Sequence, residues 1–100
     1  MDAELVERIV SYLSDRSQEM VTLLAELVRA ESPSTVPQSQ DQVLRILAER
    51  LAKLSYRVWR LAGRNCGGHL YARPRRRMGR PVQLLLGHCD TVWPLGTLAV

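Results

Sequence analysis

The sequence has no phenylalanine, and its 100 residues include only two tryptophans and three tyrosines. With 46% hydrophobic residues, its core is expected to be aliphatic, and thin, because small domains bury a smaller share of their surface. No apolar run approaches the roughly 20 residues that span a bilayer. The acidic start, Met1–Glu4, also lacks the basic residues and the unbroken apolar stretch of a secretory signal. These absences predict a cytoplasmic protein of about one small domain.

Cysteines and, in the second half, acidic residues are also scarce. Cys66 and Cys89 are the only cysteines, and in a cytoplasmic chain both are expected to be free thiols. Residues 1–56 carry nine acidic and six basic side chains, a net charge of −3. Residues 57–100 carry eight arginines and a single acidic residue, Asp90, a net charge of +7. Such asymmetry indicates either an anionic partner or a balancing acidic part of the protein that is missing.

Two helical segments are predicted in the first half. Apolar residues recur at helical spacing over residues 3–30, and the polar run Ser14–Ser17 is either a break or the solvated side of one helix. We expect one helix that can kink at this run and that ends where two prolines in five residues exclude a helix. A second helix is expected to follow from an N-cap at Ser39, with Gln42 as its capping-box partner, to about Leu54.

Three strands are predicted after the helices. The first two are Tyr56–Leu61 and His69–Ala72, separated by a glycine-rich turn. The third is Val82–Leu86, a continuous apolar run that is typical of a central strand buried on both faces. The order helix, helix, strand, strand, strand predicts an α/β layered fold. Its sheet is expected to be incomplete, because few elements remain to cover the third strand.

His88 and Asp90 follow the predicted central strand, at the carboxyl edge where open α/β sheets bind ligands. Gly87 removes a side chain where the backbone is expected to turn. Because side chains two residues apart on an extended chain point the same way, His88 and Asp90 are expected to share a face. One imidazole nitrogen can then bind zinc while the carboxylate holds the other. The plain alternative is a histidine and an aspartate in a polar loop, and these two residues alone leave it open.

The residues around this pair narrow the choice. A resemblance to the first metal-binding motif of the zinc-dependent aminoacylase and carboxypeptidase superfamily extends over Gly87-His88-Cys89-Asp90-Thr91-Val92-Trp93-Pro94-Leu95-Gly96-Thr97. That superfamily includes glutamate carboxypeptidases, acetylornithine deacetylase, succinyl-diaminopimelate desuccinylase and peptidase T. The Trp-Pro-Leu-Gly-Thr continuation is most similar to the glutamate carboxypeptidases. Upstream, Leu23–Ser34 resembles the first helix of the superfamily and its exit, and Leu47–Val58 resembles the second helix and first strand.

The resemblance implies roles for individual residues. His88 would be a ligand to one zinc ion of a two-zinc centre, and Asp90 the catalytic-site aspartate that orients and polarises it. Thr91 and Val92 would be structural. The resemblance further implies that zinc lowers the pKa of a shared water and that a glutamate acts as general base. The implied substrate is an N-acyl amino acid or a peptide with a free carboxylate.

The superfamily places its remaining ligands, its general base and a second, dimerising domain downstream of this motif. Residues 1–100 are therefore expected to be an N-terminal fragment of the catalytic domain of a metallocarboxypeptidase or deacetylase, whose parent the resemblance implies to be a homodimer. A catalytic zinc site needs three protein ligands, and here only His88 is in place, so the chain alone is expected to be inactive. The expected partner is a small-molecule substrate, with neither nucleic acid nor a membrane.

A different class of function is a small basic module that binds nucleic acid or protein through the Arg73–Arg80 loop. This loop contains Arg75, Arg76 and Arg77 in succession. However, the run is short, lies between two prolines and has no interleaved aromatic side chain for stacking bases. An exposed loop between two strands is the favoured interpretation.

Three further alternatives carry less weight. Cys89 beside His88 is a poor candidate for a catalytic thiol, because neighbours on a strand point to opposite faces. His69 has no companion ligands and is expected to be a surface or strand-edge histidine. The third alternative is an interaction or inhibitory fragment that binds other proteins through apolar surface left exposed by missing sheet partners.

Overall fold

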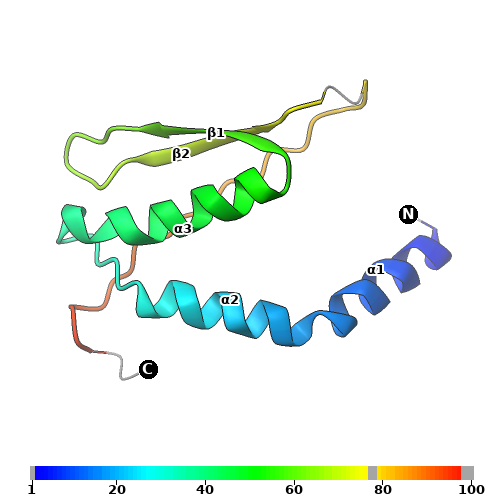
Figure 1. The fold of residues 1–100 in the computed structure, drawn as a ribbon, viewed down its shortest axis with the longest axis horizontal. Helices are drawn as coiled ribbons and strands as arrows, with labels where there is room; N and C mark the ends of the chain where they lie inside the picture. Colours follow the sequence, from blue (N-terminus) through cyan, green and yellow to red (C-terminus); the bar gives the residue numbers. More distant parts are fainter. Residues whose placement is uncertain (1, 77–78, 98–100) are drawn as a thin grey trace. The chain divides into compact units, whose positions relative to one another are not determined.

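The computed structural model describes residues 2–76 and 79–97 and contains both helices and strands. The elements are α1 (Ala3–Asp15), α2 (Ser17–Arg29), the 3-10 helix η1 (Pro37–Ser39), α3 (Gln40–Lys53), β1 (Tyr56–Leu61) and β2 (His69–Pro74), as Figure 1 shows. The chain divides after Arg29 into a helical unit and a second unit that begins at Ala30. Among the described helices, none combines the length and the apolar character that a bilayer crossing requires.

The helical unit is broken where a kink was expected. Asp2 caps α1, because its Oδ1 accepts a hydrogen bond of 2.9 Å from the backbone N–H of Leu5. The break falls at Arg16, whose N–H donates to the carbonyl oxygen of Leu13 at 3.1 Å and so closes a tighter turn than the α-helix. The Arg16 guanidinium lies 3.6 Å from the centroid of the Tyr12 ring. The prediction of a single kinked helix is thus replaced by two helices that meet at this turn.

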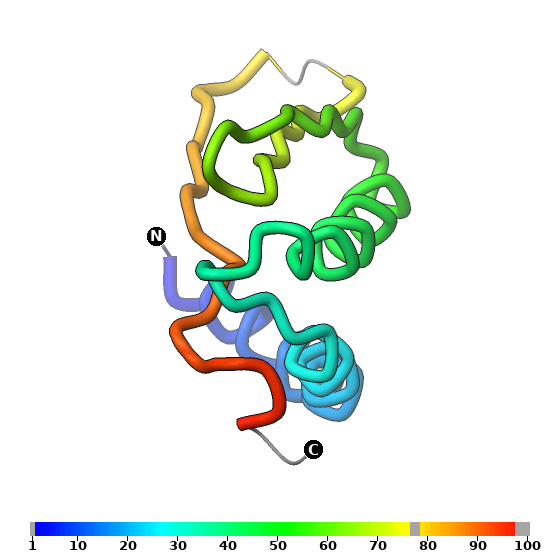
Figure 2. The backbone as a smooth tube through the Cα atoms, turned by 90° about the vertical axis from the view of Figure 1, so that its left-hand side faces the viewer, coloured from blue at the N-terminus to red at the C-terminus, as the bar shows by residue number. Residues whose placement is uncertain are grey.

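The second unit is built on an antiparallel hairpin packed against one helix. β1 has the predicted bounds, and β2 begins as predicted but extends to Pro74. Along both strands the alternate side chains that face α3 are half-buried, namely Tyr56, Val58, Leu70 and Ala72. In α3, Val43 and Leu44 are buried and form most of the small apolar core of the described residues. Figure 2 shows α3 beside the hairpin in a two-layer arrangement, so a mixed helix-and-strand fold is confirmed.

Gln40, at the start of α3, ties this layer to two loops. It is buried, and its Oε1 accepts a hydrogen bond of 2.9 Å from the N–H of Gly67 in the hairpin loop. Its Nε2 donates to the carbonyl oxygen of Pro33 at 3.4 Å. Both halves of the amide are therefore satisfied, as a buried polar group requires.

The capping box predicted for Ser39 and Gln42 does not form. Ser39 already has helical backbone angles, φ −65° and ψ −21°, and caps no N–H with its side chain. Its hydroxyl instead donates to the carbonyl oxygen of Val36 at 2.6 Å. The reason is local: η1 starts at Pro37, so a 3-10 turn precedes α3 and Ser39 lies inside it rather than before it.

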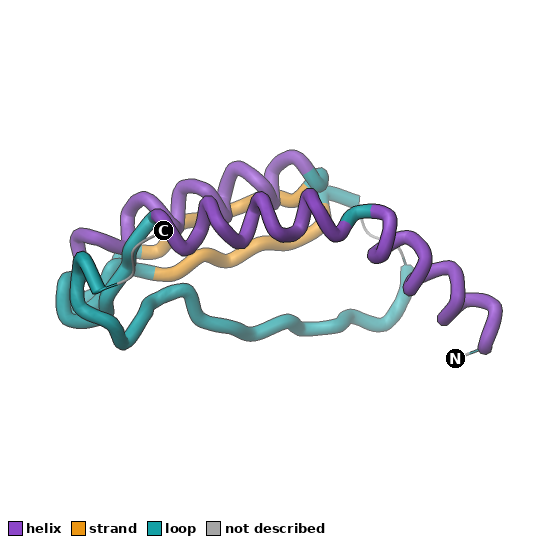
Figure 3. The backbone as a smooth tube through the Cα atoms, turned by 90° about the horizontal axis from the view of Figure 1, so that it is seen from below, coloured by secondary structure: helices purple, strands orange, loops and turns teal. Residues whose placement is uncertain are grey.

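The third predicted strand, Val82–Leu86, is wrong for this structure. The described residues contain a single sheet of two strands, β1 and β2, and residues 82–86 are loop (Figure 3). Val82, Leu84, Leu85 and Leu86 are 80–94% exposed. A buried strand needs hydrogen-bonding neighbours and covered faces, and the described part of the chain supplies neither to this segment.

Asp41 links α3 to β1 through two arginines and gives a pH-dependent prediction. Its Oδ2 lies 2.7 Å from Arg45 Nη2, one helical turn away, and its Oδ1 lies 2.6 Å from Arg60 Nη1 in β1. The hydrogen bond from Arg45, then that from Arg60, hold the pKa of the Asp41 carboxyl below its ordinary value of 3.8. Because the pKa of Asp41 is lower in the folded state, its ion pairs contribute fully to the free energy of unfolding above pH 3.8. This contribution is lost as the pH falls through the folded pKa.

We therefore expect Asp41→Asn to lower the urea midpoint of unfolding at about pH 6. At a second, acidic pH, where Asp41 of the wild type is protonated, the substitution should leave the midpoint unchanged. Tryptophan fluorescence measures the midpoint at each of the two pH values. Glu49→Gln removes an acidic residue from the same helix and is the charge-matched control. A difference between wild type and Asp41→Asn that is the same at both pH values would contradict the assignment.

Candidate functional site

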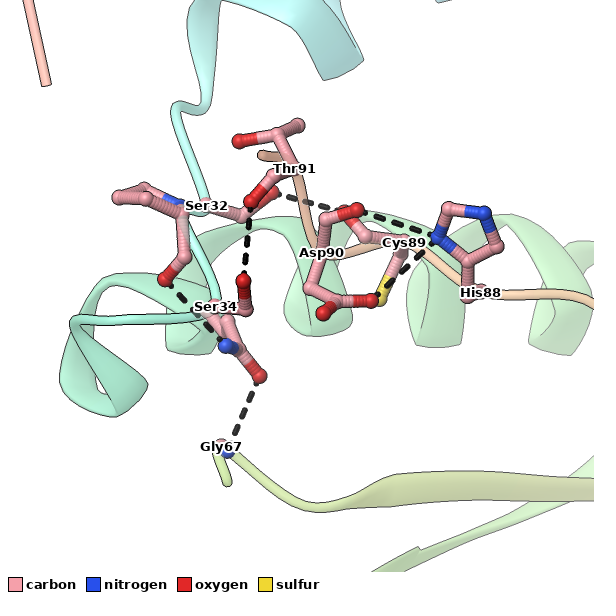
Figure 4. Close-up of polar contacts among 9 residues, drawn as sticks. Ser32, Ser34, Gly67, His88, Cys89, Asp90 and Thr91 are labelled. Atoms are coloured by element: carbon pink, nitrogen blue, oxygen red, sulfur yellow. Dashed lines mark hydrogen bonds and ion pairs between the residues drawn. The ribbon is translucent and has the colours of Figure 1, made fainter. Parts of the chain in front are cut away.

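The candidate site begins with a bridge between two segments that are far apart in the sequence. Thr91 N–H donates to the carbonyl oxygen of Ser32, and Ser34 N–H donates to that of Thr91, both at 2.9 Å. The Ser32 hydroxyl donates to the carbonyl oxygen of Cys89 at 2.8 Å, and the Ser34 hydroxyl donates to that of Thr91 at 3.2 Å. These bonds hold residues 89–91 against the chain that follows α2 (Figure 4). Ser32 is only 1% exposed, so the bridge is set within packed structure.

His88 and Asp90 are brought into contact at the edge of this bridge. His88 Nδ1 lies 3.1 Å from the backbone oxygen of Asp90 and 3.4 Å from its carboxylate Oδ1 (Figure 4). Both neighbours of Nδ1 are acceptors, so in the neutral ring Nδ1 carries the proton and donates it. Nε2 then keeps its lone pair. Within the described residues no hydrogen bond to Nε2 is formed, and the His88 side chain is 84% exposed.

This arrangement fits one position of a zinc site. A zinc-bound histidine usually donates its other ring N–H to a carboxylate or a backbone carbonyl, and His88 has both acceptors within reach. A complete site needs three or four protein ligands. No group of three or more His, Cys, Asp or Glu side chains close enough to hold a metal occurs among residues 2–76 and 79–97. The described residues therefore bring together one histidine and one carboxylate, and not a complete set of metal ligands.

Cys89 is held in a form that disfavours nucleophilic chemistry. Burial raises the pKa of its thiol above the ordinary value of 9.0, and the negative charge of Asp90 raises it further. The thiol is therefore protonated at neutral pH, whereas a catalytic cysteine needs its thiolate. This agrees with the interpretation of Cys89 as a packed residue behind His88. Cys66 and Cys89 are both free thiols, as expected.

The second half of the motif forms a turn that is also anchored. Thr97 N–H and its hydroxyl both donate to the carbonyl oxygen of Pro94, at 3.2 and 2.7 Å. Gly96 N–H donates to Glu31 Oε1 at 2.9 Å. Gly96 has φ +80°, a conformation that glycine adopts readily. The motif is therefore fastened to residues 31–34 on both sides of Trp93.

Other candidate residues lie apart from this site. His69 is exposed at the start of β2, as predicted, and its Nε2 lies 3.9 Å from Cys66 Sγ. Gly87 does not have the backbone role that was expected, since its φ is not positive and an added Cβ would meet nothing within 4 Å. In the Arg73–Arg80 segment, Arg73 belongs to β2 and Arg77 lies outside the described residues.

The contributions of Ser32 and Ser34 were not predicted from the sequence. Both serines were assigned only to the exit of the first helix, since nothing local in Ser32-Pro33-Ser34 marks a partner 57 residues away. The buried position of Ser32 beside a proline is the one feature that distinguishes it from an ordinary loop serine.

Comparison of the chain with protein-family models, with curated proteins and with solved structures returned no match. The similarity to the zinc-dependent aminoacylase and carboxypeptidase superfamily therefore depends on the residues of the motif and its upstream segments. The geometry at His88 and Asp90 is a separate observation, because it follows from the structure of this chain.

Proposed function

We propose that this chain contributes a zinc ligand, His88, and its orienting carboxylate, Asp90, to a hydrolase that cleaves an amide bond next to a carboxylate. The observation that carries the proposal is the contact of His88 Nδ1 with Asp90, which leaves Nε2 exposed and free to coordinate. The substrate class, an N-acyl amino acid or the last residue of a peptide, comes from the resemblance of Gly87–Thr97 to the superfamily motif.

In this proposal each residue near His88 has a physical role. Asp90 accepts a hydrogen bond from the Nδ1–H of His88 through its backbone oxygen, with its carboxylate 3.4 Å away, which fixes the tautomer and the ring orientation. Ser32 and Ser34 hold the backbone of residues 89–91, so the carboxylate stays beside the ring. When bound, zinc supplies a Lewis acid that polarises the scissile carbonyl and makes water acidic enough to be activated near neutral pH.

The remaining ligands and the general base are proposed to come from outside the described residues. The resemblance implies two zinc ions, a glutamate base and a homodimeric assembly. Because the described residues supply a single ligand, the chain by itself is proposed not to hydrolyse amides. The net charge of +7 in residues 57–100 is consistent with an acidic part of the assembly that balances it.

Long-range ¹H–¹⁵N NMR of the histidine rings tests the proposal directly. The measurement is made on Cys66→Ser, because the Cys66 thiol beside His69 is itself a soft zinc ligand. At a pH where both rings are neutral, we expect His88 to be the Nδ1–H tautomer, and added Zn²⁺ to shift Nε2 of His88 and leave its Nδ1 protonated. Asp90→Ala should lower the Nδ1–H share, with the backbone oxygen of residue 90 as the remaining acceptor.

His69 in the same spectrum is the internal control, since its ring has no carboxylate partner among the described residues. If His88 were mainly the Nε2–H tautomer, or if Zn²⁺ displaced the proton from Nδ1, the proposed ligand geometry would be wrong. A Zn²⁺-induced shift that is equal at both histidines would show ordinary surface binding and would also count against it.

A further inference from the structure

The face of the hairpin that points away from α3 carries a regular pattern of paired side chains. In the β1–β2 register the cross-strand partners on this face are Arg57 with Arg73, Trp59 with Tyr71, and Leu61 with His69. All six are exposed, whereas the alternate residues are half-buried toward α3. We call these six residues the outer face. It is distinct from the His88 site, which lies on the 87–97 segment.

The centre of the outer face is an aromatic pair open to solvent. The rings of Trp59 and Tyr71 have centroids 5.5 Å apart with an interplanar angle of 33°. They are 43% and 48% exposed, so each ring presents a large apolar surface to water. Flat aromatic surfaces in this setting are the platforms on which single-stranded nucleic acids stack their bases.

Beside the aromatic pair lie two arginines whose charges are not compensated. Arg57 and Arg73 are directly opposite each other, a position in which like charges destabilise a sheet. Within the described residues neither guanidinium forms a hydrogen bond or an ion pair, and residues 57–89 contain no acidic side chain. Arg60 makes the contrast clear, because on the other face it bonds to Asp41 at 2.6 Å. The outer face therefore has two arginines at cross-strand positions and no acidic side chain on either strand to compensate them.

We infer that the outer face binds single-stranded nucleic acid. A phosphate is held between Arg57 and Arg73, and an adjacent base stacks on Trp59 and Tyr71. A negatively charged phosphate complements the positive charges of the two arginines, and the neighbouring aromatic rings favour a ligand with exposed bases. An acidic peptide would satisfy the arginines but not the rings, and a duplex hides the faces of its bases. The inference goes beyond the proposed hydrolase function and does not depend on it.

The expectation from the sequence was that nucleic acid is not a partner, because the Arg73–Arg80 run is short, lies between two prolines and has no interleaved aromatic side chain. Strand pairing supplies aromatic side chains near arginines, because it places Trp59 of β1 and Tyr71 of β2 next to Arg57 and Arg73. Arg75 and Arg76 follow β2, are exposed, and extend the positive charge along one path for the phosphate backbone.

Fluorescence anisotropy with a labelled thymidine oligonucleotide of about ten nucleotides tests the arginines, since site sizes on such platforms are of this order. We expect the double variant Arg57→Ala, Arg73→Ala to bind at least about tenfold more weakly. The slope of log K against log salt should fall by about 0.7, because one phosphate is held between the two arginines. The charge-matched control is Arg8→Ala, Arg29→Ala, with both changes in the separate helical unit, and it should retain most of the affinity. Removal of the opposed charges should leave the hairpin at least as stable, so unfolding would not explain lost binding.

The stacking contribution is measured with Trp59→Leu, which keeps an apolar side chain but removes the ring. We expect about a tenfold loss of affinity, at the lower end of what one stacked base contributes. In Trp93→Leu, where Trp59 is the remaining tryptophan, the oligonucleotide should quench the fluorescence. The inference is overturned if the oligonucleotide fails to bind at low salt, if the control double variant loses as much affinity, or if polyglutamate or duplex DNA binds as tightly.

Discussion

Under the proposed hydrolase function, replacing His88 with alanine is expected to abolish zinc-dependent amide hydrolysis and to lower the zinc content of the recovered protein. The gene is expressed from its own locus with an affinity tag, so that the chain is recovered with whatever else belongs to its assembly. Zinc is measured by mass spectrometry, and turnover is followed on N-acyl amino acids and on dipeptides that end in glutamate. Loss of a direct ligand removes both metal and activity, because a catalytic zinc has only about three protein ligands.

Asp90→Asn should have a smaller but still large effect. The amide keeps an oxygen near Nδ1 but loses the negative charge that favours the Nδ1–H tautomer of His88. Changes to such orienting partners cost about 10–100-fold in metal affinity or activity. His69→Ala is the matched control and should leave both zinc content and turnover unchanged. Full zinc content and turnover in His88→Ala would refute the hydrolase proposal. Hydrolysis by residues 1–100 alone with added zinc would instead refute the proposal that the chain is inactive by itself.

Gly68→Ala is expected to produce a large loss of stability, although it removes no interacting side chain. Gly68 has φ +107°, a backbone conformation that side chains rarely adopt. An added Cβ would lie 2.5 Å from the carbonyl oxygen of Leu61, which is backbone and cannot swing away. Strain and overpacking together should cost about 2 kcal/mol or more. For a unit of this size that lowers Tm by about 8 °C or more, measurable by circular dichroism.

Two other glycines separate the causes of this loss. Gly79 has φ +62° but nothing within 4 Å of an added Cβ, so Gly79→Ala should show the strain alone, about 1 kcal/mol. Gly87 has neither a positive φ nor a near neighbour, and Gly87→Ala should change stability by less than about 0.5 kcal/mol. Equal Tm values for all three variants would mean that the hairpin loop is not packed as the structure shows.

The fold could be predicted where local pattern decides it and not where long-range partners do. Tyr56–Leu61 alternates between side chains that face α3 and side chains that face water, and its bounds were predicted correctly. Val82–Leu86 has an equally strong pattern, but its prediction as a strand was wrong. A strand exists through the hydrogen bonds of its neighbours, and the described residues give this segment none. The prediction of Ser39 as an N-cap was wrong for a local reason, since the 3-10 turn that begins at Pro37 includes Ser39.

The sequence by itself determined the pairing of His88 with Asp90. Two residues separated by one position on an extended chain face the same way, so their proximity needs no other part of the protein. The same geometry predicted that Cys89 does not act as a nucleophile with His88, because adjacent side chains on an extended chain point to opposite faces. These are consequences of backbone geometry over three residues.

Only the tertiary structure decided what holds that pair and what else the surface carries. The hydrogen bonds from Ser32 and Ser34 to residues 89 and 91 span 57 positions, and the register that sets Trp59 against Tyr71 and Arg57 against Arg73 joins two separate strands. Spacing along one chain fixes only which way neighbouring side chains point. Contacts between distant segments depend on which backbone groups meet after the chain has folded, and no local pattern contains that information.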